Sequence, residues 1–322
     1  MPAPRTTLSG FRPDLGTMFQ FDQLMNQKGF IGNLVAPVFE AAEQAGTYGI
    51  VPLKQLLKEP QVGRNDNGWY NRTNFTFEDT TYATKERGIE MPIDRRKAKI
   101  YRDFFDFETV CAANCFDVVL RAAEKRVADM IFNATTFASY TGAVSIPWST
   151  VATATPIDDV NTAVQTVWNN TGVWPNAICF NRKVFRNLRR CTQITDKIAS
   201  SGAGSSIEPG KITVAQIASC FDLANVFVAG SARDTANEGQ AVSISSVWSD
   251  AYAMVFRVAE TNMIEEPCLA RTLHWGADGS TIGGTIETYY EDQSRGDVVR
   301  VRHEVEERIQ YTAMGYLLSN IT

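Results

Sequence analysis

Histidine is the side chain most often used for acid–base catalysis near neutral pH, and the chain contains two, His274 and His303. His303 lies in a strand-like run of alternating residues, and His274 stands beside Trp275 ahead of a glycine-containing turn. No Ser or Cys in a nucleophile-elbow or similar signature accompanies either histidine. The sequence therefore favours structural or surface positions for both and disfavours a serine or cysteine hydrolase.

Cysteine pairs could instead bind a metal ion. Cys111 and Cys115 stand four residues apart in a helical pattern and would share one face, but no second pair with ligand spacing accompanies them. A place in the core is the stronger interpretation, and we expect no metal site. All the cysteines fall in apolar or mixed periodic stretches, so we expect reduced, buried thiols. They are Cys111, Cys115, Cys179, Cys191, Cys220 and Cys268.

The glycine-rich stretch 204–211 superficially resembles a phosphate-binding loop. Five residues rather than four separate Gly204 from Gly210, and Pro209 removes an amide donor beside the second glycine. Ile212 also stands where a Ser or Thr would hold magnesium. We therefore expect no nucleotide and no other cofactor.

Overall charge argues against a protein that reads a nucleic-acid sequence. The 322 residues include 36 acidic and 31 basic side chains, for a net charge of −5 with both histidines neutral. A protein that grips phosphates is usually basic. The sequence shows no signal peptide and no apolar run of the ~20 residues that a membrane span needs, so we expect a chain that is made in the cytosol.

Charge is unevenly distributed within the chain. Residues 286–310 carry seven acidic residues against four Arg, and residues 82–102 carry seven basic residues against three acidic ones. Such asymmetry usually marks a solvated face. It could also mark complementary surfaces on neighbouring subunits, and the residues alone leave both interpretations open.

The basic stretch leads into the longest periodic pattern of the chain. Apolar residues recur at spacings of three and four from Asp106 to Asn133, which predicts an amphipathic helix about 42 Å long at ~1.5 Å per residue. Residues 82–94 before it read as a strand. So long a helix needs a large surface to lie against.

Two segments before this helix lack a core of their own. Residues 1–45 cluster apolar side chains without a sustained period, and this arm is either covered by another part of an assembly or packed on its own domain. Residues 69–78 alternate with partly polar side chains on both faces, and residues 81–91 would return antiparallel to them. Such a hairpin has little core to hold it, so we expect it to project and find a partner elsewhere.

The remainder predicts an α+β subdomain followed by strands. Helices are expected at 158–169, 182–190 and 213–221, with strands at 176–180 and 225–230 and a flexible loop at 200–210. Thr213 and Gln216 have the spacing of a capping box. Further strands are expected within 241–258, 269–274, 285–291 and 298–306. The apolar C-terminus should finish inside a sheet.

Several short stretches, in this order, carry a family resemblance: 45–53, 82–94, 120–129, 247–254 and 315–320. The order of parts resembles that of tailed-phage major capsid proteins of the Hong Kong ninety-seven type, over nearly the whole chain. The resemblance implies an α+β fold with an N-terminal arm at 1–48, an extended E-loop at 49–95, a peripheral domain with a spine helix at 96–149 and 266–322, and an axial domain at 150–265.

The resemblance also implies a function. Subunits would form pentamers and hexamers that close an icosahedral shell around double-stranded DNA, contacted without sequence specificity, in a virion assembled in the host cytoplasm. A separate scaffolding protein, a portal and possibly a decoration protein would be partners. Alternatives are an encapsulin-like nanocompartment shell and, more weakly, a soluble microbial hydrolase.

Candidate site residues follow from the projecting hairpin, the charge asymmetry and this resemblance. The intersubunit candidates are Arg64, Trp69, Tyr70, Arg72, Phe75, Phe77, Lys85, Arg87, Glu90, Arg95, Arg96, Lys97, Glu304, Glu306 and Glu307. The axial-loop candidates are Ser200, Gly202, Gly204 and Gly210. No catalytic, cofactor-binding or metal-binding residue is predicted.

Overall fold

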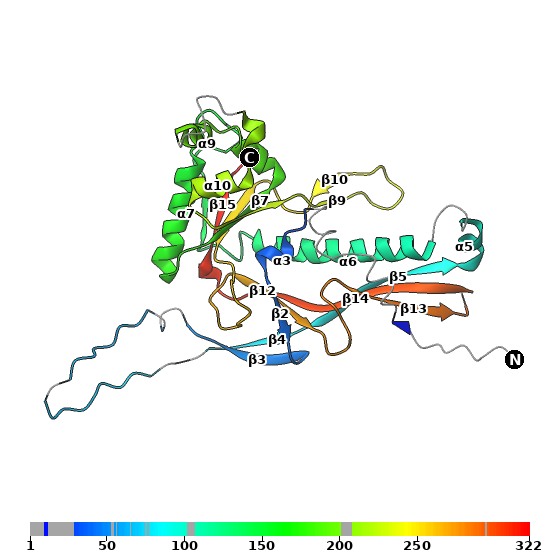
Figure 1. Cartoon of the computed structure of the whole chain (residues 1–322), viewed down its shortest axis with the longest axis horizontal. Helices are drawn as coiled ribbons and strands as arrows, with labels where there is room; N and C mark the ends of the chain where they lie inside the picture. The colour runs from blue at the N-terminus through cyan, green and yellow to red at the C-terminus, as the bar shows by residue number, and fades with distance from the viewer. Residues whose placement is uncertain are drawn as a thin grey trace.

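A long helix laid across a sheet and a compact α+β unit beside it make up the body of the molecule (Figure 1). The computed structural model describes residues 10–11, 29–52, 55, 57–64, 66–74, 76, 78–101, 107–200, 208–293 and 295–322. The predicted α+β class is confirmed.

The long helix, α6 (Phe107–Ile131), confirms the predicted helix at 106–133. Its 25 residues measure about 37 Å at ~1.5 Å per residue. The side chains of its buried stripe recur every three or four residues, as an amphipathic helix requires, because only one face meets the sheet. The stripe includes Cys115, Val119, Leu120, Val127 and Ile131.

The sheet beneath α6 has six strands within the described residues, and with α6 it forms what we call the spine unit. Its longest strand, β14 (Gly296–Ile309), pairs along one edge with β5 (Lys85–Asp94) and along the other with β13 (Thr285–Glu291) and then β12 (Ala270–Trp275). The outer strands are β1 (Gly10–Phe11), beside β13, and β2 (Val38–Ala41), parallel to β12. Ile93, Val299 and Val301 bury the sheet face under Phe116.

The described part of the arm packs on its own chain. Phe30 and Ile31 are buried, and Ile31 precedes the short helix α3 (Gly32–Val35). Val35 joins a core cluster with Ile131 of α6. Of the two alternatives for the arm, this one holds for residues 29–41.

The predicted pairing of residues 69–78 with 81–91 is wrong. Strand β4 (Glu78–Ala83) instead pairs antiparallel with β3 (Ala45–Ile50), while β5 belongs to the spine sheet. The described residues between 57 and 74 form no strand and extend away from the body as a long loop (Figure 1). A projecting loop is present, as expected, but its base is formed by residues 45–50 and 78–83.

The compact unit is a five-stranded sheet with helices packed on it. Its strand order is β6 (Thr141–Ala143), β15 (Gly315–Ser319), β11 (Tyr252–Phe256), β7 (Ala177–Asn181) and β8 (Asn225–Ala229). Its helices are α7 (Pro156–Thr171), α8 (Arg182–Leu188), α9 (Thr192–Ile198) and α10 (Val214–Phe221). The predicted helices and strands of this region are confirmed, including the capping box of Thr213 and Gln216; α9 was not predicted.

Strands β6 and β15 come from stretches that the predicted division gave to the peripheral domain. Both lie in the sheet of the compact unit, and β15 pairs there between β6 and β11. The apolar C-terminus does finish inside a sheet, as predicted. The predicted domain boundaries stay a prediction.

A core cluster is shared by the two units. It contains Val127 and Ile131 of α6, Met254 of β11, Leu269 before β12 and Leu317 of β15. Apolar side chains from both sheets therefore pack into one continuous cluster.

Smaller elements complete the described chain. The hairpin of β9 (Ala232–Asp234) and β10 (Ile244–Ser246) leaves the compact unit and projects above α6 (Figure 1). Helix α5 (Arg95–Tyr101) follows β5. Two single-turn helices, η2 (Pro209–Lys211) and η3 (Thr312–Met314), lie near the 200–210 loop and before β15.

Candidate assembly surfaces

The projecting loop carries three strongly exposed large apolar side chains, including the two most exposed among the described residues. Trp69 is 90% exposed, Val62 88% and Tyr70 71%. Isolated apolar side chains are common on surfaces, but here three gather on one loop that has no core. The loop therefore presents apolar surface that no described part of the chain covers.

Polar contacts along the loop hold its two sides together. The Arg64 guanidinium donates to the Gly68 carbonyl at 2.8 Å and lies over the Tyr70 ring at 4.8 Å from its centroid. Asn71 donates its side-chain amide to the Gln61 carbonyl at 2.8 Å. Arg72 is exposed. Phe75 and Phe77, also predicted to be interface residues, lie outside the described residues.

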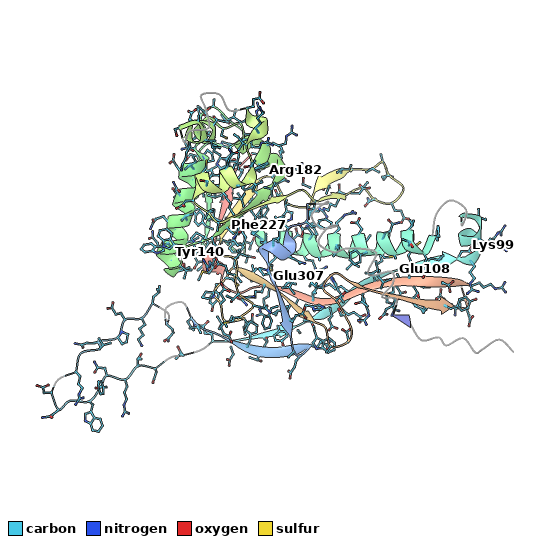
Figure 2. All side chains as sticks on the ribbon, in the orientation of Figure 1. Lys99, Glu108, Tyr140, Arg182, Phe227 and Glu307 are labelled. Carbon is cyan, nitrogen blue, oxygen red and sulfur yellow. The ribbon has the colours of Figure 1, made fainter. Side chains whose placement is uncertain are left out.

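Three glutamates of β14 have partners within the chain. Glu306 accepts from the Ala83 N–H at 2.7 Å, and the buried Glu304 accepts from Thr84 Oγ1 at 3.1 Å. Glu307, which Figure 2 labels, pairs with the Arg126 guanidinium of α6 at 2.6 Å. These contacts fasten the loop base and α6 to the sheet, and an intersubunit role for the same residues stays a prediction.

Among the described residues of the basic stretch before α6, Arg95 has a carboxylate partner within the chain. Because β5 pairs antiparallel with β14, Glu90 lies beside Arg300 at 2.5 Å, and Arg95 beside Asp297 at 3.5 Å. The Arg95 guanidinium also lies over the Tyr290 ring. Ion pairs between these strands thus account for part of the charge asymmetry seen in the sequence.

The other basic candidates are less engaged. Lys85 and Arg96 are exposed, and the Arg87 Nε is buried without a hydrogen-bond partner in the described chain. Lys97 lies in α5, and its side chain is outside what the structure describes. Their role in assembly stays a prediction.

Two of the four axial-loop candidates lie within the described residues. Ser200 donates its hydroxyl to the Lys197 carbonyl at 2.8 Å, and the Gly210 carbonyl accepts from the Arg189 guanidinium. Gly202 and Gly204 lie outside the described residues. The structure brings neither Ser200 nor Gly210 to the projecting loop.

A buried carboxylate that sequence reasoning missed joins three parts of the chain. Glu124 of α6 accepts from the backbone N–H groups of Ile31 and Gly32 at 2.8 and 2.6 Å, and from Trp248 Nε1 at 2.6 Å. Burial raises the pKa of this carboxyl, while the three donors act in the opposite direction. Glu124 therefore fastens the arm and the compact unit to the spine helix.

A signal for Glu124 was present in the spacing. It stands four residues after Leu120 and three before Val127, in phase with the buried stripe. A charged residue in phase with the apolar positions indicates a buried polar contact, although it does not identify the partners.

The histidines occupy buried structural positions, as the sequence favours. His274 Nδ1 lies 2.7 Å from Glu40 Oε2, and its Nε2 lies 3.4 Å from Ser280 Oγ. This order resembles a hydrolytic triad, but Ser280 and His274 are buried and the Ser280 hydroxyl accepts from the Glu304 N–H at 3.0 Å. The hydroxyl is thus held within the sheet edge rather than presented to a substrate.

The cysteines are buried and unpaired, which confirms the sequence prediction. Burial raises the pKa of the Cys115 thiol to about 11, so it stays protonated and unreactive at neutral pH. Within the described residues there is no His, Cys, Asp or Glu cluster suited to a metal ion. No helix in that part of the chain is long and apolar enough to cross a membrane.

Comparisons with known proteins point to one fold. No family model and no curated protein sequence matches the chain. The structure is similar to a phage-related protein from Bordetella bronchiseptica, with a TM-score of 0.68, 16% identity and 98% of each chain covered.

Two further solved structures extend the likeness. The capsid of cyanophage P-SCSP1u gives a TM-score of 0.54 at 10% identity, over 88% of this chain and 86% of that one. The encapsulin of Synechococcus elongatus gives 0.54 at 10% identity, over 100% and 92%. The chain therefore has the fold shared by tailed-phage capsid proteins and encapsulins, as the sequence resemblance implies.

Proposed function

We propose that the chain is the major capsid protein of a tailed phage, which self-assembles through pentamers and hexamers into an icosahedral shell around double-stranded DNA. The observation that carries this proposal is the projecting loop with Trp69, Tyr70 and Val62 in solvent, on a chain whose whole length follows a shell-protein fold. An apolar loop without a core is stable in water only at a cost, and a neighbouring copy would cover it.

The surroundings of such a shell belong to the same proposal. A separate scaffolding protein, a portal and a decoration protein would be partners, in a virion assembled in the host cytoplasm. The solved capsid structures are those of structural proteins, and the buried contacts of Ser280 and His274 support a non-enzymatic role.

Electron microscopy of the overexpressed chain tests the proposal directly. Closed shells, tubes or capsomers are expected in negative stain. A stable, monodisperse monomer at every salt concentration would contradict it.

Two loop variants locate the contact that drives assembly. Deletion of residues 64–77 should leave a folded chain by circular dichroism but abolish shells, because the exposed loop contributes little to the core. The milder change Trp69→Ser should weaken assembly, whereas Met263→Ser, a control at a side chain 67% exposed elsewhere, should not. Normal shells from the deletion variant would show that the loop is not the intersubunit contact.

A nanocompartment shell is the second candidate, favoured by the encapsulin likeness over the whole chain. The two differ in content. Particles from the native source should contain double-stranded DNA if the chain is a capsid protein, and an abundant co-purifying enzyme without DNA if it is an encapsulin.

A further inference from the structure

A polar cleft of about 440 Å³ opens on the compact unit beside α8 and the end of β10. Four basic side chains line it: Arg182, Lys183, Arg186 and Arg190. Every other lining residue is also polar, including Asn187 and, from β10, Ser246. Figure 2 marks Arg182 on this side of the unit.

The sequence places these side chains together through the helix repeat. Val184 and Leu188 are fully buried, which fixes the inner face of α8. Arg182 and Arg186 stand four residues apart and lie along its outer side, about 6 Å from each other. Arg190 follows two residues beyond the end of α8 and lines the same cleft. The three arginines thus line one cleft.

These three arginines lack the carboxylate pairing that the chain gives to the arginines of the spine sheet. Lys183 is neutralised by Asp250 at 2.5 Å, whereas none of Arg182, Arg186 and Arg190 has a carboxylate partner in the described chain. Arg300 and Arg302 of the spine sheet, by contrast, each pair with acidic side chains. Three exposed positive charges therefore remain together on a chain whose net charge is −5.

The cleft offers hydrogen-bond donors and positive charge but no apolar anchor among its described lining residues. Guanidinium forks match the oxygens of phosphate and carboxylate groups. Centres of protein–protein interfaces are usually apolar or aromatic, whereas phosphate contacts use Arg, Lys, Asn and Ser side chains like those here. We propose that this cleft binds the phosphodiester backbone of nucleic acid without reading its sequence, an inference that rests on the proposed shell around DNA.

Fluorescence anisotropy with a labelled 20-base-pair duplex of mixed sequence tests the site. The full chain is taken from the unassembled fraction of a sizing column. Arg186→Gln combined with Arg190→Gln should weaken duplex binding roughly tenfold at low salt and lower the salt slope by about 0.9 for each phosphate that the variant no longer neutralises. Lys99→Gln combined with Arg295→Gln removes the same charge from exposed positions elsewhere and should leave the affinity within about twofold.

The outcomes separate this inference from the proposed function. No duplex binding by the unchanged chain, or equal losses in both double variants, would overturn the cleft. A parallel titration uses labelled polyglutamate. If the double variant at Arg186 and Arg190 no longer binds polyglutamate but still binds the duplex as the unchanged chain does, the proposal is overturned and the cleft is assigned to an acidic protein segment. If shells form normally but duplex binding does not depend on the cleft, the proposed nucleic-acid site alone is refuted. If duplex binding depends on the cleft but the chain never assembles, the proposed shell function alone is refuted.

Discussion

Gly32 shows how closely the arm is fitted to the spine helix. A Cβ atom at this position would lie 2.6 Å from Glu124 Oε2, the oxygen that accepts from the Gly32 N–H. Gly32→Ala should displace the carboxylate and lower the free energy of unfolding by about 1 to 3 kcal/mol, because buried donors lose their acceptor. Urea denaturation followed by tryptophan fluorescence measures the change.

The chain offers a matched control for this substitution. A Cβ at Gly63 would meet nothing within 4 Å, so Gly63→Ala should leave the stability almost unchanged. Equal effects of the two substitutions would mean that the Glu124 contact does not hold the arm.

His303 gives the molecule a pH-dependent stability. Burial, with the Arg126 guanidinium 3.4 Å away, lowers its pKa from 6.5 to about 4. The unfolded chain therefore binds a proton near pH 6.5 that the folded chain does not, so the stability is complete above pH 6.5 and is lost as the pH falls towards 4. Because the unfolded chain takes up this proton, the free energy of unfolding should fall by about 3 kcal/mol between pH 6.5 and 4.

Denaturation curves at several pH values compare the chain with its His303→Gln variant. The variant should be less stable at pH 7 but should lose less stability between pH 6.5 and 4, because it has no imidazole to protonate. Parallel pH profiles would show that His303 does not carry the effect.

Single residues were predicted unevenly from the sequence. The structural positions of the histidines and the burial of the thiols followed from the lack of partner motifs and from apolar surroundings. The sequence predicted Glu124 as one of the polar residues between the apolar positions of the helix. Its burial was missed because its partners Ile31 and Trp248 lie 93 and 124 residues away. Spacing along one helix carries no information about contacts so distant.

Helices were easier to predict than strand partners. The 3.6-residue repeat of α6 is a property of its own sequence, whereas residues 69–78 alternate with polar side chains on both faces. Such a pattern allows many registers, since no buried face selects one. The apolar run at 45–50 is the partner that β4 takes instead.

Helix α5 allows the electrostatic part of assembly to be tested. Reversal of Arg95, Arg96 and Lys97 to Glu should impair assembly more at low salt than at high salt, because salt screens exposed charges beyond ~8 to 10 Å at physiological ionic strength. Light scattering at both salt concentrations measures the effect.

The intrachain pair of Arg95 with Asp297 needs its own control. Arg96→Glu alone leaves that pair intact and should retain part of the salt-dependent defect. Equal impairment at both salt concentrations would indicate a folding defect rather than a weakened surface attraction.

The core cluster shared by the two units should make them unfold together. Leu317 is fully buried in that cluster, on the strand that finishes the chain inside the compact sheet. Leu317→Ala should cost about 2 to 5 kcal/mol and lower a single thermal transition. Val242→Ala, at a side chain 71% exposed, should have almost no effect; two separate transitions in calorimetry would contradict a shared core.

At the level of the whole chain, the order of the parts was easier to predict from the sequence than the sheet to which each strand belongs. The arm, loop, spine helix and compact unit follow one another as the resemblance implies. Strands β6 and β15 pair with each other across 176 residues and join the sheet of the compact unit, although both lie in stretches assigned to the predicted peripheral domain. Such returns of the chain depend on tertiary packing, not on local pattern.

The parallel pairing of β2 with β12 can form only late in the synthesis of the chain. Residues 38–41 find their sheet partner only when residues 272–275 have been made. At about 5 to 20 residues per second this takes roughly 10 to 50 s. During that interval the arm can contact α6, with which Val35 shares a core cluster, but β2 has no strand edge to pair with. The arm therefore joins the spine sheet only when the last sixth of the protein is being made.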